Sequence, residues 1–476
     1  METKRNLTGA EKAAYGLGAV GKDMVYMLSA SYIQYYFYDL LGMSSIALGI
    51  ILMAARIFDA FNDPLMGVIV AKTKTRWGKF RPWLMIGTVT NAVILGFMFS
   101  CPPTLSGSGL IAYCAIFYIL WGVTYTMMDI PYWSMIPAFT KGGKEREGLT
   151  TLARSCAGVG SALVSILTMM IVHALGEAFG GGSNNQIEIV GLKYFAWIIA
   201  ILFVVFITIT CIFVKEKSTV DIESPSVGEM FRALIQNDQA MAVVVAIVCI
   251  NTALYVTSNL VIYFFKYDLG GVNWFKDYTL FNTVAGAAQI LAMMALYPIL
   301  RNFFNSIKIF YISIGISIIG YVVLLGLATA GVTAVPVFLV PGVLIMAAAG
   351  MNNVIITVFL ANTVDYGELK NNRRDESVIF SMQTFVVKLA TGIAILITSI
   401  ALQFLNLKSG DATEAEKLMD LSKGVAQSSK MGLRMVMTIL PIIGLIFAFC
   451  WFKKKYILTD SKVEEIAGEL EKKHQA

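Results

Sequence analysis

Charged residues occur inside stretches of this sequence that are otherwise apolar. Placing one charge at the centre of a membrane-spanning helix costs about 2.5–3.5 kcal/mol on the insertion scale. Charges in such stretches are therefore expected to face one another or water, which indicates a polar cavity between helices for a hydrophilic or ionic cargo. The eight residues concerned are Lys22, Asp23, Arg56, Asp59, Asp63, Asp129, Arg154 and Lys388.

The segment ARIFDAFNDP carries Arg56, Asp59 and Asp63 at spacings i, i+3 and i+7, which puts all three on one face of a helix. Two carboxylates one turn apart repel each other in a low dielectric, and a small cation, a proton or Arg56 would relieve that repulsion. Carboxylates with a nearby hydroxyl or amide suit a hard cation such as Na⁺. We predict a cation site, a Na⁺ site if sodium is coupled, at Asp59 and Asp63, with Asn62 and Thr126 nearby. The alternative is a structural ion-pair cluster, but two acids against one base favour the cation site.

The segment TYTMMDIPYWS places Thr126, Asp129 and Trp133 on one helix face by the same spacing. A carboxylate beside an indole suits a pyranose, whose hydroxyls donate to the carboxylate while its C–H face stacks on the ring. The alternative is that Trp133 belongs to the aromatic belt of the membrane interface and that Asp129 merely neutralises a base. The predicted sugar-binding residues are Asp23, Asp129, Trp133, Arg154 and Lys388.

Two further ionisable residues are expected to lie outside this site. Lys22 adjoins Asp23, and consecutive helical residues point about 100° apart, so Lys22 is expected to face elsewhere. His173 lies near the end of an apolar stretch, and we expect a packing or rim role for it.

The elements that must position these residues are membrane-spanning helices. The chain has 476 residues, of which 57% are hydrophobic and 14% charged, a composition typical of a polytopic membrane protein. A spanning helix needs about 20 mostly apolar residues. Runs of that length predict twelve spans, at residues 13–38, 44–71, 82–101, 109–137, 149–175, 190–214, 240–266, 277–298, 309–330, 335–363, 377–403 and 432–453.

The basic residues predict the orientation. The loop at 72–81 carries five basic residues and no acidic one, whereas the loops at 102–108 and 331–334 carry no charge. The positive-inside rule therefore places both termini in the cytoplasm. The net charge of +6 follows from that rule, so it indicates no nucleic-acid partner.

One long polar stretch, 215–239, divides the spans into two sets of six. We predict an N-terminal bundle at 1–214, a cytoplasmic middle loop at 215–239 and a C-terminal bundle with a cytoplasmic tail at 240–476. A charged loop followed by a helix with a lone base, Arg154 or Lys388, occurs in each half and indicates a weak internal repeat. Transporters are often built from such repeats, whereas no filter loop typical of a channel is visible.

Several segments together resemble the glycoside–pentoside–hexuronide:cation symporter family, over essentially the whole chain. They are GKD (21–23), ARIFDAFNDPLMG (55–67), TRWGKFRPW (75–83), TYTMMDIPYWS (124–134) and DYGELK (365–370). The likeness is greatest to the melibiose permeases. It implies an all-α membrane protein of the major-facilitator type, with twelve transmembrane helices in two six-helix bundles, which moves a sugar together with Na⁺, Li⁺ or H⁺.

The resemblance also implies roles for individual residues. The residues implied for the cation are Asp59 and Asp63, with Thr126 close by. Those implied for a galactoside are Asp23, Asp129, Trp133 and Arg154, with Lys388 beside both sites. Two segments depart from the family pattern: PGVLIMAAAGMNN lacks the sugar-facing aromatic of span ten, and DYGELKNNRRDES lacks the usual Gly-Lys-Arg wording.

We therefore expect symport of a melibiose-like galactoside with Na⁺, Li⁺ or H⁺ by alternating access, in the plasma membrane, by a monomer embedded in the lipid bilayer and without a cofactor. Another glycoside, a pentoside, a hexuronide or uncoupled sugar uniport remain alternatives. An enzyme is not expected, because the sequence contains no HExxH, GxSxG or P-loop motif, and the intact site residues argue against a scaffold or sensor. The basic loop at 72–81 is expected to pair with Glu145 and Glu147 and so to latch one conformation.

Overall fold

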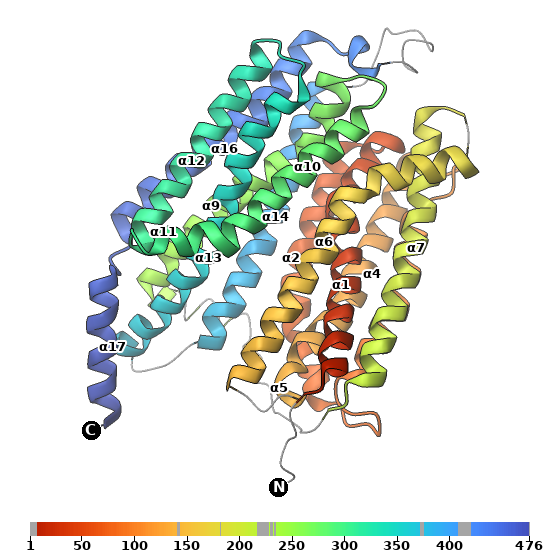
Figure 1. The fold of residues 1–476 in the computed structure, drawn as a ribbon. Coiled ribbons are helices and arrows are strands. Elements are labelled where there is room, and N and C mark those ends of the chain that lie inside the picture. The colour runs from red at the N-terminus through yellow and green to blue at the C-terminus, as the bar shows by residue number, and fades with distance from the viewer. Residues whose placement is uncertain are drawn as a thin grey trace. The chain divides into compact units, whose positions relative to one another are not determined.

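The structure is a computed structural model. It describes residues 7–139, 143–180, 182–216, 228, 232, 235–371, 376–407 and 420–475. Every long element in these ranges is a helix, and the chain divides into two compact units, Met1–Ser224 and Pro225–Ala476 (Figure 1).

The first unit holds the helices of the predicted N-terminal spans. They are α1 (Gly9–Gln34), η1 (Tyr35–Leu40), α2 (Ser45–Lys72), α3 (Arg81–Met98), α4 (Gly107–Ser134), α5 (Ile136–Phe139), α6 (Gly143–Phe179) and α7 (Asn184–Phe213). Helix α1 packs against α6 and α7, and α4 packs against α2 and α3. Figure 1 shows α1, α6 and α7 side by side.

Local sequence signals set the start and the spacing of these helices. Thr8 caps α1 in a capping box with Glu11, whose backbone N–H donates to the Thr8 hydroxyl at 3.2 Å. Gly160 of α6 lies against the backbone of α1, since a Cβ at this position would come within 2.3 Å of the Val20 carbonyl oxygen. Only glycine permits this approach, which brings α6 close to α1.

The second unit repeats the all-helical pattern. It contains α9 (Asp238–Tyr263), η2 (Phe264–Leu269), α10 (Trp274–Leu291), η3 (Ala292–Leu296), α11 (Tyr297–Arg301), α12 (Ser306–Thr329), α13 (Val335–Asn371), α14 (Glu376–Leu405), η4 (Leu421–Gly424), α16 (Gln427–Lys455) and α17 (Asp460–Gln475). Within it α9 packs against α14 and α16, and α12 packs against α13.

The two units begin with the same helix design. The first long helix of each unit ends in a π-helical turn, YYFYDL in η1 and FFKYDL in η2. A glycine with positive φ follows each turn, Gly42 at 72° and Gly270 at 70°. This repeat of sequence and geometry is more explicit than the pattern of Arg154 and Lys388 from which a repeat was predicted.

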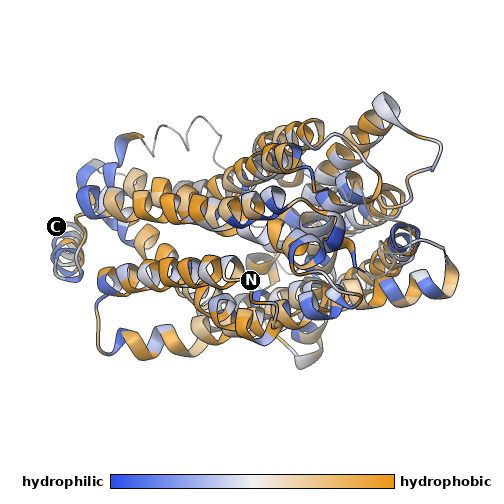
Figure 2. Ribbon diagram, turned by 90° about the horizontal axis from the view of Figure 1, so that it is seen from above, coloured by the Kyte–Doolittle hydropathy of each residue, from blue (hydrophilic) through white to orange (hydrophobic). Residues whose placement is uncertain are grey.

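The helices match the predicted spans closely, with differences mainly at their ends. Among the described residues, 10 helices are long and apolar enough to cross a membrane. The two other predicted spans lie in α1 and α3, which are helical but more polar: α1 contains Lys22 and Asp23, and α3 begins at Arg81. Figure 2 shows hydrophobic residues over most of the length of the helices.

Candidate functional site

The acidic cluster of α2 meets α4. The Thr126 hydroxyl of α4 donates to Asp63 Oδ1 at 3.0 Å, and Arg56 Nη1 lies 3.6 Å from Asp59 Oδ2. Arg56 and Asp59 are buried, with 2% and 6% of their surface exposed. The structure therefore brings together three residues of the predicted cation site, Asp59, Asp63 and Thr126, with Arg56 beside them, as the helical spacing predicts.

A glycine on α4 gives Asp59 its position. A Cβ at Gly122 would lie 2.5 Å from Asp59 Oδ1, so the carboxylate occupies the space that a side chain would need. Gly122 precedes Thr126 by one turn, so one face of α4 contacts both acids of α2.

A second cluster joins α1 to α4. Lys22 Nζ lies 2.7 Å from Asp129 Oδ1 and 3.4 Å from Asp23 Oδ2. The Lys22 side chain is only 4% exposed, whereas Asp129 is 27% exposed. The two carboxylates compensate the charge of the buried ammonium. Asp23 and Asp129 are 19% and 27% exposed, so both can accept further hydrogen bonds.

Trp133 forms one wall of this second cluster. Its Nε1 donates to Asp129 Oδ1 at 3.1 Å, which fixes the indole one turn along α4 from the acid. The Arg154 guanidinium of α6 lies over the ring with its Cζ 4.0 Å from the centroid, and Lys22 Nζ lies 5.1 Å from it. Both cations are placed for cation–π attraction to the indole. Asp23, Asp129, Trp133 and Arg154, predicted to act together, thus form one cluster.

Asn62 and Lys388 are the two other residues predicted at these sites. The Asn62 Nδ2 atom is buried and makes no hydrogen bond within the described part of the chain. Lys388 lies on α14 in the second unit, where it is half-buried. Its proximity to both sites stays a prediction.

The prediction for Lys22 was wrong. Its 2.7 Å contact with Asp129 places it at the centre of the second cluster. The 100° argument describes where the Cβ atoms point, but the long, flexible lysine side chain reaches around the helix. The signal that could have found it is the cost of a buried ammonium, which requires a carboxylate partner.

The basic loop at 72–81 and His173 also lie near carboxylates in the first unit. The side chains of Glu145 and Glu147 lie outside the described residues. Glu216, after α7, instead accepts from the backbone N–H groups at the start of α3, including that of Lys79 at 2.7 Å. His173 is buried, with Nε2 3.5 Å from Glu188 Oε1, so it packs against a buried carboxyl.

Comparison with known proteins identifies the family. Residues 14–460 match the family model described as MFS/sugar transport protein. The lactose permease of Lactobacillus delbrueckii subsp. bulgaricus is 26% identical over 97% of this chain and 72% of its own length. The isoprimeverose transporter of Lactiplantibacillus pentosus is 27% identical over 87% of this chain and 84% of its own. A putative glycoside/cation symporter of Escherichia coli K12, YagG, is 25% identical over 99% and 96%.

Solved structures share the fold. A D-xylose–proton symporter superimposes with a TM-score of 0.61 at 14% identity, covering 92% of this chain and 96% of that one. The nucleoside transporter NupG gives a TM-score of 0.61 at 12% identity, covering 93% and 98%. The chain is thus an all-α, multi-pass membrane transporter of the major-facilitator fold and not an enzyme, and it belongs to the MFS sugar transport proteins, the family of glycoside–pentoside–hexuronide:cation symporters.

Proposed function

We propose that this protein carries a glycoside, best matched by a melibiose-like galactoside, into the cell together with Na⁺, Li⁺ or H⁺ by alternating access. The observation that carries the proposal is that α4 contributes to both clusters: Thr126 donates to Asp63 at 3.0 Å, and Asp129 pairs with Lys22 at 2.7 Å. Helix α4 then contributes to both proposed binding sites, so that binding of one solute can change the affinity for the other, as coupled transport requires.

The cation is assigned to Asp59, Asp63 and Thr126. Carboxylate and hydroxyl oxygens suit Na⁺ and Li⁺, and either carboxylate can hold a proton instead. Arg56, 3.6 Å from Asp59, is the positive charge that an incoming cation must compete with. The cation is a transported solute in this scheme, and no other cofactor is proposed.

The sugar is assigned to the cluster of Asp23, Asp129, Trp133 and Arg154, with Lys22 added by its position. Sugar hydroxyls would donate to the carboxylates and accept from Lys22, taking over part of the 2.7 Å contact that Lys22 makes with Asp129. The ring of Trp133 offers a stacking surface, and Arg154 occupies part of it at 4.0 Å. Arg154 is exposed and can move aside as the sugar enters.

The pairing of Asp129 with Trp133 suits a pyranose, and the choice of a galactoside among pyranoses rests on the resemblance to the melibiose permeases. The names of the relatives point to other sugars, lactose, raffinose and isoprimeverose among them. Another glycoside, a pentoside or a hexuronide are therefore the rival substrates, and uncoupled sugar entry is the rival mechanism.

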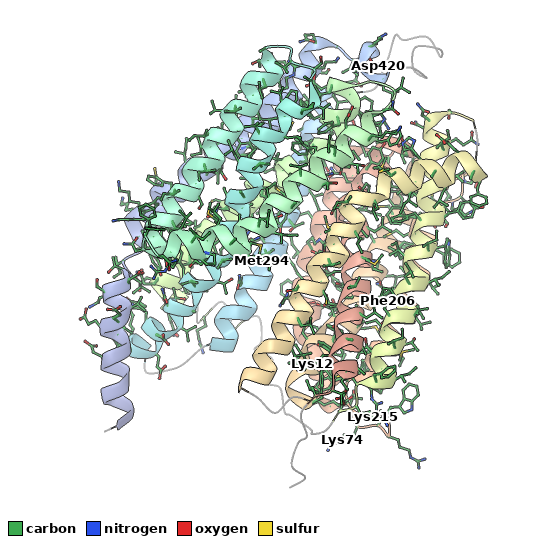
Figure 3. All side chains as sticks on the ribbon, viewed as in Figure 1. Lys12, Lys74, Phe206, Lys215, Met294 and Asp420 are labelled. Carbon is green, nitrogen blue, oxygen red and sulfur yellow. The ribbon has the colours of Figure 1, made fainter. Side chains whose placement is uncertain are left out.

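We further propose that the protein lies in the plasma membrane as a monomer. Both termini and the middle loop at 215–239 then face the cytoplasm. Lys12, Lys74 and Lys215 gather at one end of the first unit (Figure 3). Such a basic end supports a cytoplasmic orientation.

Uptake into membrane vesicles tests the proposal. Vesicles containing the protein should accumulate labelled melibiose when an inward Na⁺, Li⁺ or proton gradient is imposed, and should only equilibrate it without one. If melibiose only equilibrates whichever gradient is imposed, the protein is a uniporter. If melibiose does not enter while lactose or xylose accumulates, the substrate is that other sugar.

A further inference from the structure

Tyr26 of α1 lies between two groups of residues, the cation cluster of Arg56, Asp59, Asp63 and Thr126 and the sugar cluster of Lys22, Asp23, Asp129, Trp133 and Arg154. It follows Lys22 by one helical turn, so the two side chains share a face of α1. Its ring centroid lies 5.7 Å from the Arg56 Cζ of α2. The same ring lies 5.5 Å from the Tyr125 ring and 6.3 Å from the Trp121 ring, both on α4.

Each side of Tyr26 contacts a group that belongs to one cluster. On the cation side, Arg56 also lies 3.6 Å from Asp59. On the sugar side, the Tyr125 hydroxyl lies 3.3 Å from Lys22 Nζ, which in turn contacts Asp129 at 2.7 Å. A continuous series of side-chain contacts therefore runs from Asp59 to Asp129 through two tyrosines, Tyr26 and Tyr125.

The charges in this series depend on the bound solutes. A cation beside Asp59 repels the Arg56 guanidinium and weakens its pairing with that carboxylate. The rings of Tyr26 and Tyr118, with centroids 5.7 and 5.9 Å from the Arg56 Cζ, attract a displaced guanidinium by cation–π interaction, and of the two Tyr26 also contacts Tyr125. A ring held more tightly by Arg56 restrains Tyr125, which positions Lys22 for the sugar.

We propose that Tyr26 is a positioning residue that couples the two clusters, so that cation binding strengthens sugar binding through its ring. The inference rests on the proposed function and adds a side-chain route to the route through α4. The interactions named are those of the ring, so phenylalanine should replace tyrosine here and an aliphatic residue should not.

The experiment measures the ratio of two affinities in the purified full-length protein. The affinity for p-nitrophenyl α-D-galactopyranoside is titrated calorimetrically with and without saturating Na⁺, and with Li⁺ or lower pH where one of these is the coupling ion. Coupling in the wild type should tighten galactoside binding about 5–150-fold. In Tyr26→Leu and Tyr26→Met the factor should fall by about threefold or more, to the value that the route through α4 supports alone, and Tyr26→Phe should retain most of the wild-type factor.

A matched control separates coupling from packing. The ring of Tyr113 on α4 packs at a tilt against that of Phe117, with centroids 4.4 Å apart, and its hydroxyl donates to the Phe97 carbonyl at 2.5 Å, apart from the contacts named for either cluster. Tyr113→Leu removes a ring from the same unit and should leave the ratio at its wild-type value, even if both affinities change together.

The outcomes are distinct. A wild type that lacks coupling overturns the proposed function itself, whatever the variants do. A coupled wild type with an unchanged ratio in Tyr26→Leu and Tyr26→Met overturns the role of Tyr26 alone. Loss of galactoside binding in both variants, with Na⁺ binding retained, would also overturn it, because Tyr26 would then be a direct sugar contact.

Discussion

Lys22 of α1 and Asp129 of α4 form an ion pair of 2.7 Å that ties two helices together at the centre of the sugar cluster. The ammonium is almost fully buried, with 4% of the side chain exposed, and its second carboxylate neighbour is Asp23 at 3.4 Å. The pair therefore has two roles that experiment can separate: it holds α1 against α4, and it presents charged groups to a ligand.

Replacing Lys22 by methionine should destabilise the protein. Removing one partner of a buried ion pair costs about 3–5 kcal/mol, because the other charge stays behind in a low dielectric. Asp129 is 27% exposed, so we expect a loss near the lower end of that range. Thermal unfolding in detergent, followed by tryptophan fluorescence, should show a clear drop in Tm.

The double variant Lys22→Met/Asp129→Asn is the control for this prediction. It removes both charges, so it should recover most of the lost Tm and still fail to bind a galactoside. A single Lys22→Met variant as stable as the wild type would contradict the ion pair as an important tie between the two helices.

Gly122→Ala should impair the cation site selectively. The added Cβ would lie 2.5 Å from Asp59 Oδ1, so the carboxylate must move away from α4. We expect Na⁺ affinity to fall about tenfold or more, the equivalent of roughly 1.4 kcal/mol, while galactoside affinity without Na⁺ stays within about twofold. Gly158→Ala on α6 is the matched control, because among the described residues a Cβ there meets nothing within 4 Å beyond its own stretch of helix, so both affinities should be unchanged. Equal behaviour of the two variants would argue against Asp59 as a cation ligand.

Trp133→Ala should weaken galactoside binding by roughly 1–3 kcal/mol, the scale of a lost aromatic surface. Asp129→Ala should nearly eliminate binding, because it removes an acceptor that also orients the indole through a 3.1 Å hydrogen bond. Isothermal titration with a galactoside measures both effects, and Na⁺ affinity is the internal control in Trp133→Ala. Wild-type galactoside affinity in both variants would exclude this sugar site.

The sequence predicts the membrane helices well because their signal is local. Long apolar runs and the spacing i, i+3, i+7 follow from helix geometry alone, so the spacing is enough to place Arg56, Asp59 and Asp63 on one face. Which neighbour that face contacts is a tertiary property. The contact of Thr126 with α2 and that of Asp129 with α1 depend on how α4 packs, although both residues share one helical face.

The features that were missed depend on side-chain length or on comparing distant segments. Lys22 was misplaced because a Cβ direction is a poor guide to a flexible ammonium. The repeat of η1 and η2 is visible as the similar sequences YYFYDL and FFKYDL. It is found only by comparing these two distant segments and not from local periodicity. The role of Tyr26 needs the contact with Arg56 at 5.7 Å, which joins residues 30 positions apart.

Asp63→Cys should abolish accumulation driven by a cation gradient while leaving part of the downhill entry of sugar. Asp63 accepts the 3.0 Å hydrogen bond from Thr126 and is proposed to bind the coupling ion, whereas the sugar contacts lie elsewhere on α4. Counterflow and gradient-driven uptake of labelled melibiose into vesicles separate the two activities. Thr126→Val should act in the same direction but more weakly, since one hydrogen bond contributes about 1 kcal/mol. Normal gradient-driven accumulation in Asp63→Cys would contradict the cation assignment.

The sharpest prediction concerns the thermodynamic link between the two sites. If α4 joins them through Thr126 and Asp129, saturating Na⁺ should tighten galactoside binding about 5–150-fold, which corresponds to the usual coupling free energy of ~1–3 kcal/mol. Linkage then requires the galactoside to tighten Na⁺ binding by the same factor, and calorimetry can measure both directions on one preparation. Asp59→Cys should erase the dependence while sugar contacts stay in place, because Asp59 belongs to the cation cluster alone. If the galactoside affinity is the same with Na⁺, with Li⁺, at low pH and without any of these, the protein is a uniporter and the symport proposal is wrong.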